Sequence, residues 1–76
     1  MKYIEELHPG DTFELDNHKY VLSCDFKQNG DRNCINLFNG QSNWIGSSTI
    51  VNICPIYILD KENNIIPIKP TEKTNV

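Results

Sequence analysis

The sequence has no alanine and only one arginine among its 76 residues. Alanine is the strongest helix former, so its absence argues against a helical fold. The net charge of −3 argues against a general nucleic-acid binder, because such proteins neutralise phosphates with a basic face. No apolar run approaches the ~20 residues of a transmembrane helix. The acidic start is also unlike a signal peptide, so we expect a cytoplasmic protein with no membrane segment.

Sequence motifs for catalysis and for metal binding are lacking as well. Cys24, Cys34 and Cys54 form no CxxC pair, and neither they nor His8 and His18 have the close spacing of zinc ligands. The chain also has no glycine-rich phosphate loop. We therefore predict a protein that is not an enzyme, with no catalytic residues, no metal, no cofactor and three free thiols.

Isoleucine and asparagine dominate the composition, with ten residues of each. Isoleucine favours strands, and asparagine tolerates the positive φ of tight turns. Short alternating runs between turn dipeptides predict an all-β fold, a small barrel or β-roll of five to six short antiparallel strands, as one domain over residues 1–68. Residues 3–7 predict one N-terminal helical turn, and the polar residues 69–76 a flexible tail.

The first hairpin is predicted around a two-residue turn at positions 16 and 17. Such a loop places Phe13 opposite Tyr20 on one face of the hairpin, and Glu14 opposite Lys19 on the other. The apolar pair on the inner face and the opposite-charge pair on the outer face both favour this same register.

Two Asn-Gly dipeptides predict the next two hairpins, because type I′ turns need positive φ at both central positions. A two-residue loop at the first dipeptide sets Leu22 opposite Leu37 and Cys24 opposite Ile35, all facing the core. These apolar pairs favour this register over its neighbours.

The same register has an unfavourable consequence at the hairpin end. It sets Lys27 opposite Arg32, a like-charge pair, and turns Cys34 outward opposite Asp25. A slip by one residue relieves the charge clash but drives Asn36 into the core. We prefer the first register, because it keeps the polar amide out of the interior.

Apolar side chains are also expected on the outer face of these strands. In the preferred register, Val21, Phe38 and Ile45 lie on the side opposite the core. Either the N-terminal segment 3–7, through its apolar side chains Tyr3, Ile4 and Leu7, or a second protein would cover them.

Part of the chain resembles a known group of small β proteins. Residues 7–13, Leu-His-Pro-Gly-Asp-Thr-Phe, resemble the start of the first strand of SH3-like barrels, where an L-x-x-G-D-x-φ segment is common. The stretch 34–51, with its Asn-Gly turn and Trp44, is similar to their central strands. Over residues 7–53 the chain is similar to small proteins of tailed bacteriophages, especially marine ones. The resemblance implies an SH3-like barrel in the cytoplasm of an infected bacterium, and no particular activity.

The leading functional interpretation is a non-catalytic protein-binding or assembly module, such as a phage accessory protein. The alternative is a small barrel that binds a nucleotide or single-stranded nucleic acid by stacking bases on aromatics beside cations. The candidate binding residues for these functions are Val21, Phe38, Trp44, Ile45, Lys27 and Arg32.

A second candidate surface lies in the last predicted hairpin, over residues 56–68. It carries more isoleucine than one face of a two-stranded hairpin can hold, and Pro67 discourages open-ended strand pairing. We predict a closed homodimer through this hairpin, with a host or phage protein as the other candidate partner. The predicted interface residues are Ile56, Ile58, Ile66 and Ile68.

Overall fold

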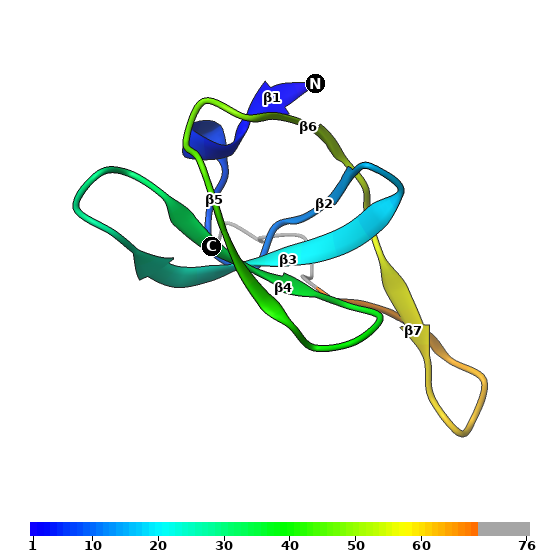
Figure 1. Cartoon of the computed structure of the whole chain (residues 1–76). Coiled ribbons are helices and arrows are strands. Elements are labelled where there is room, and N and C mark those ends of the chain that lie inside the picture. The colour runs from blue at the N-terminus through cyan, green and yellow to red at the C-terminus, as the bar shows by residue number, and fades with distance from the viewer. Residues whose placement is uncertain (69–76) are drawn as a thin grey trace, which may run out of the picture.

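The computed structural model describes residues 1–68, so the tail predicted over residues 69–76 lies outside the described part. The elements are β1 (Lys2–Tyr3), the 3₁₀ helix η1 (Ile4–Glu6), β2 (Thr12–Leu15), β3 (His18–Phe26), β4 (Arg32–Asn36), β5 (Ser42–Ile45), β6 (Ile50–Ile53), β7 (Tyr57–Leu59) and β8 (Ile65–Pro67). Six strands form a curled antiparallel sheet in the order β1-β6-β2-β3-β4-β5 (Figure 1), and β7 and β8 form a separate two-stranded sheet. The fold is therefore all-β with one N-terminal helical turn, as predicted.

Two regions of the chain are separated at Pro55. We call residues 1–54 the body and residues 56–68 the arm; Figure 1 shows the β7–β8 hairpin projecting away from the curled sheet. Strand β6 ends at Ile53, and Pro55, which has no backbone N–H to donate to a ladder, follows it. The body side of the junction is fixed, because Thr12 Oγ1 donates to the Cys54 carbonyl (2.7 Å) and Cys54 N–H donates to the Thr12 carbonyl (3.1 Å).

The first hairpin, β2–β3, has the predicted register. Positions 16 and 17 have φ values of 52° and 67°, as a type I′ loop requires. The rings of Phe13 and Tyr20 stack with centroids 5.4 Å apart, and Lys19 Nζ lies 3.6 Å from Glu14 Oε2. A two-residue loop and the side-chain pairs therefore specify the same alignment.

The predicted register of the second hairpin, β3–β4, is wrong. Its loop has three residues, 28–30, and only Gly30 has positive φ, at 98°. Lys27 N–H donates to the Asp31 carbonyl (2.9 Å), so Lys27 does not lie opposite Arg32 and the like-charge pair is avoided. A type I turn followed by a left-handed glycine is the usual three-residue alternative to a type I′ loop.

A bulge in β3 shifts this register further. The shift lies between Leu22 and Phe26, so that Leu22 faces Cys34, and both of these side chains are buried. Cys24, predicted in the core, lies in the bulge and is exposed, and Leu37, also predicted in the core, is 37% exposed. Cys34, predicted to face outward, is fully buried instead. The one-residue slip set by the three-residue loop turns Cys34 inward, whereas the bulge moves the pairing by two more residues and leaves that alternation unchanged.

The third hairpin, β4–β5, also has a longer loop than predicted. Residues 37–40 form a four-residue loop in which Gly40 N–H donates to the Asn36 carbonyl (2.7 Å) and Asn36 N–H donates to Gln41 (2.8 Å). Asn36 is therefore buried, which the preferred register had avoided. Its Oδ1 accepts the Phe38 N–H (2.8 Å), and this bond offsets the cost of burying the amide.

The core is built from both the sheet and the N-terminal segment. The buried apolar side chains are Ile4, Leu7, Phe13, Leu22, Cys34 and Val51. Ile4 N–H donates to the Thr49 carbonyl (2.9 Å) and Glu5 N–H to the Ser47 carbonyl (3.0 Å), so η1 is tied to the β5–β6 connection. The expectation that this segment covers the outer face is wrong: Ile4 and Leu7 fill the inner face, and Tyr3 is half-exposed.

Candidate binding surfaces

The arm has two apolar faces. Its register pairs Tyr57 with Pro67, Ile58 with Ile66 and Leu59 with Ile65. Directly opposite residues share a face, and successive residues alternate between faces. One face therefore holds Tyr57, Leu59, Ile65 and Pro67, and the other holds the predicted interface residues Ile56, Ile58, Ile66 and Ile68. A hairpin with one face on a core would have one polar face instead.

None of the arm's residues is buried. Six large side chains range from 36% exposed at Ile68 to 71% exposed at Ile65, and Ile56 is half-buried. Neither β7 nor β8 joins the six-stranded sheet, so their only strand partners among residues 1–68 are each other. An isolated two-stranded hairpin is marginally stable at best in water. The arm therefore exposes apolar surface that its own fold does not bury.

The tip of the arm is organised by Asp60. Its Oδ1 accepts the N–H groups of Glu62 (2.9 Å) and Asn64 (2.8 Å), and Asn63 adopts a positive φ of 67°. The bond from the Asn64 backbone is the main reason that the pKa of Asp60 lies below its usual value. The charged carboxylate thus holds the turn that joins β7 to β8.

A second candidate surface surrounds Trp44 on the outer face of the body. Lys27 Nζ lies 4.8 Å from the centroid of the Trp44 ring, a cation–π contact. Trp44 is opposite Asn33 in the β4–β5 pairing, while Val21 is opposite Ile35 and half-buried. Three predicted binding residues, Lys27, Trp44 and Val21, therefore belong to one face of the sheet.

The other predicted binding residues are placed elsewhere. Ile45 packs against the core, so its predicted outward orientation is wrong, and it lies opposite Arg32 on that inner face. Phe38 lies in the β4–β5 loop and is 73% exposed. Because Arg32 and Trp44 are on opposite faces, the two cations and two aromatics do not form one stacking groove.

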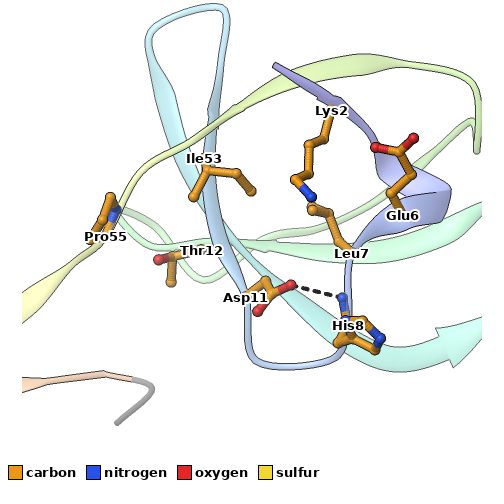
Figure 2. A pocket seen from close by; sticks show the side chains of 8 residues that line it. All are labelled: Lys2, Glu6, Leu7, His8, Asp11, Thr12, Ile53 and Pro55. Atoms are coloured by element: carbon orange, nitrogen blue, oxygen red, sulfur yellow. Dashed lines mark hydrogen bonds between the residues drawn. The ribbon is translucent and has the colours of Figure 1, made fainter. Parts of the chain in front are cut away.

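A groove of about 360 Å³ lies near the root of the arm, between the N-terminal segment, the start of β2 and the end of β6 (Figure 2). It is lined by Lys2, Glu6, Leu7, His8, Asp11, Thr12, Ile53 and Pro55. Its polar groups are partly engaged, because His8 N–H donates to Asp11 Oδ2 (2.8 Å) and the Thr12 hydroxyl bonds to Cys54. Sequence reasoning missed this groove, since three segments distant in sequence form it and no local motif marks it.

The cysteines do not resemble an activated nucleophile. Burial raises the pKa of the Cys34 thiol to about 11. The charge of Arg32 lowers this pKa, but by less than burial raises it. Cys24 is exposed, Cys54 is half-buried, and all three are free. Within residues 1–68, no three His, Cys, Asp or Glu side chains come together as a metal site would require.

Comparison with known protein families, with curated proteins and with solved structures finds no match for this chain. The described part of the chain also has no helix with the length and apolar character that a membrane crossing requires. The most distinctive feature of its surface is the arm, which is apolar on both faces.

Proposed function

We propose that this protein is a non-catalytic assembly module that forms a homodimer through its arm. The observation that carries the proposal is that six of the arm's seven large apolar side chains, all except the half-buried Ile56, are exposed and spread over two faces. Exposed apolar patches of this kind mark interaction sites in soluble proteins. The body has its own buried core, so the arm is available for association.

The area of the arm fits a contact with a second copy. The exposed parts of its six exposed large side chains amount to roughly 500–800 Å², if each whole side chain presents about 150–250 Å². Two arms together expose roughly 1,000–1,600 Å² of such side chains, which is comparable with the total area that a specific interface buries. A second copy supplies such a surface without any other component, and two-fold symmetry closes the assembly.

A matched pair of lysine substitutions tests the proposal. Ile58 in the arm and Ile50 in the body are both 51% exposed. We expect Ile58→Lys to convert the dimer to a monomer in sedimentation velocity at about 100 µM, because a charge would be buried without a partner. Ile50→Lys should leave the dimer intact. A monomeric wild-type protein at this concentration, or equal effects of the two substitutions, would contradict the proposal.

Binding of a nucleotide or a single nucleic-acid strand is the second candidate function. It is favoured by the half-exposed Trp44 beside Lys27, and disfavoured by the position of Arg32 on the other face and by the net charge. Titration with oligothymidylate at low salt, followed by Trp44 fluorescence, tests it. Quenching that weakens steeply as salt rises would support this function, and no quenching would exclude it.

A further inference from the structure

The two long edges of the arm are not equivalent. Ile68 N–H donates to the Ile56 carbonyl (3.0 Å), and Asp60 N–H donates to the Asn64 carbonyl (3.1 Å). Antiparallel pairs alternate between hydrogen-bonded and non-hydrogen-bonded, so the Ile58–Ile66 pair is also hydrogen-bonded. The backbone groups of the remaining pairs therefore point outward from the hairpin: those of Tyr57 and Leu59 on β7, and those of Ile65 and Pro67 on β8.

Proline makes only one of these edges unsuitable for another strand. On β8, Pro67 offers no N–H, so the ladder that an added strand needs is incomplete. On β7, Tyr57 and Leu59 offer both N–H and both C=O groups, and these groups have no partner among residues 1–68. Free edges of this kind are templates for strand addition.

We infer that β7 pairs antiparallel with β7 of a second copy, which specifies the contact within the homodimer proposed above and depends on that dimer. A two-fold axis at Ile58 sets Tyr57 of one copy opposite Leu59 of the other, so the outward groups of the two residues bond to each other. The edge is self-complementary, which favours a second copy over an unrelated strand. The result is a sheet of the order β8-β7-β7-β8.

The same pairing explains why the assembly stops at two copies. Both outer edges of the combined sheet are β8 edges, where Pro67 blocks further addition. An edge-to-edge contact through an unblocked strand on each side would continue as a fibre. Proline in β8 therefore acts after dimerisation, and it leaves the ladder within each arm intact.

A pair of proline substitutions distinguishes the two edges. Leu59 and Ile65 lie opposite each other on one face of the arm, at 64% and 71% exposure, and both N–H groups point outward. Leu59→Pro removes two hydrogen bonds per dimer and should raise the dimer Kd roughly 10- to 100-fold. Ile65→Pro removes an equivalent side chain and N–H from the blocked edge, and should change the Kd less than about 3-fold. Sedimentation equilibrium measures both constants.

Disulfide trapping provides a second measurement that does not depend on proline being tolerated. In a Cys24→Ser background, Ile58→Cys sets two thiols opposite each other at the axis, within the reach of a disulfide. Position 66 lies directly opposite position 58 within each arm. In the combined sheet, however, the two cysteines of an Ile66→Cys dimer would be about three strand spacings apart, roughly 14 Å. We expect mild oxidation to yield a covalent dimer with Ile58→Cys, and none with Ile66→Cys.

The outcomes separate this inference from the dimer proposal. Trapping at position 58 alone, together with loss of the dimer in Leu59→Pro alone, supports pairing through β7. Equal loss of the dimer in both proline variants, or equal trapping at positions 58 and 66, overturns pairing through β7 and leaves a dimer made by the faces of the arm. A wild-type chain that is monomeric at about 100 µM overturns both.

Discussion

The body buries part of its apolar side chains in a core, whereas the arm buries none. The arm is 13 residues long and holds five of the ten isoleucines: Ile56, Ile58, Ile65, Ile66 and Ile68. Within the body, Ile4 is fully buried and Ile45 packs against the core. In the arm, every isoleucine retains some exposure to solvent.

The difference shows that closure, and not apolar content, creates a core. The six-stranded sheet is curled (Figure 1). Its buried side chains Phe13 and Leu22 form one core cluster with Ile4 and Leu7 of the N-terminal segment. Two strands alone have no second layer against which to pack their faces. The body therefore has a core of its own, whereas the arm has no buried residue.

The largest effect is expected from truncating the interior of the body. Phe13 is fully buried and stacks on Tyr20, so Phe13→Ala should lower the free energy of unfolding by about 3–5 kcal/mol. Leu59→Ala in the arm should change it by less than about 0.5 kcal/mol at protein concentrations where the chain is monomeric. Urea unfolding followed by far-ultraviolet circular dichroism measures both. Equal losses would show that the arm contributes to the same cooperative core.

A smaller effect is expected from the buried thiol at alkaline pH. The pKa of Cys34 is about 11 in the folded protein, against an ordinary value of 9.0. Between these values the unfolded chain loses its thiol proton and the folded chain keeps it, so stability falls as the pH rises through this window. In Cys34→Ala this component of the decline should be absent, measured by urea unfolding at several pH values.

Thiol labelling offers an independent check that Cys34 is buried while Cys24 is exposed. Exposed Cys24 should react rapidly with a thiol reagent in the native protein, and buried Cys34 only as fast as the body unfolds. Equal labelling rates would contradict the observed β3–β4 register, because the predicted register had exchanged the positions of these two residues.

The sequence predicted the fold class, the first hairpin and the arm, but only part of the core. Positions 16 and 17 permit a two-residue loop, and the loop fixes the register. The Asn-Gly dipeptides are compatible with loops of different length, and the structure uses three residues at Gly30 and four at Gly40. Each change of loop length moves the register, and the bulge in β3 moves it again. These choices depend on contacts made across the whole sheet, which local sequence does not contain.

The candidate site shows the same limit. Both isoleucine-rich strands and the position of Pro67 were predicted, because alternation and turn residues are local signals. The open edge of β7 was not predicted, since it depends on which pairs of the hairpin are hydrogen-bonded. The grouping of Arg32 with Trp44 could not be tested without knowing the β4–β5 register, which places them on opposite faces.

A still smaller, local effect on backbone amide exchange is expected at the tip of the arm. Asp60→Ala removes the acceptor for the N–H groups of Glu62 and Asn64, so amide exchange at Asn64 should accelerate while body amides are unchanged. In the wild-type chain, the stabilising contribution of Asp60 is present above its unfolded pKa and is lost as the pH falls through the lowered folded pKa. Asp25→Ala, an exposed acid in the β3 bulge, is the control and should leave Asn64 unchanged.

The smallest effect is expected on the outer surface of the body, at the pair of Glu14 and Lys19. Their charged atoms are 3.6 Å apart and both side chains are about one-third exposed, so solvent and salt screen the attraction. A double-mutant cycle with Glu14→Gln and Lys19→Met should give a coupling of about 0.2–0.5 kcal/mol that decreases as salt is added. A coupling several times larger would mean that surface charge contributes substantially to the register of β2 and β3. The predicted small value attributes the register instead to the tight loop and to the stack of Phe13 on Tyr20.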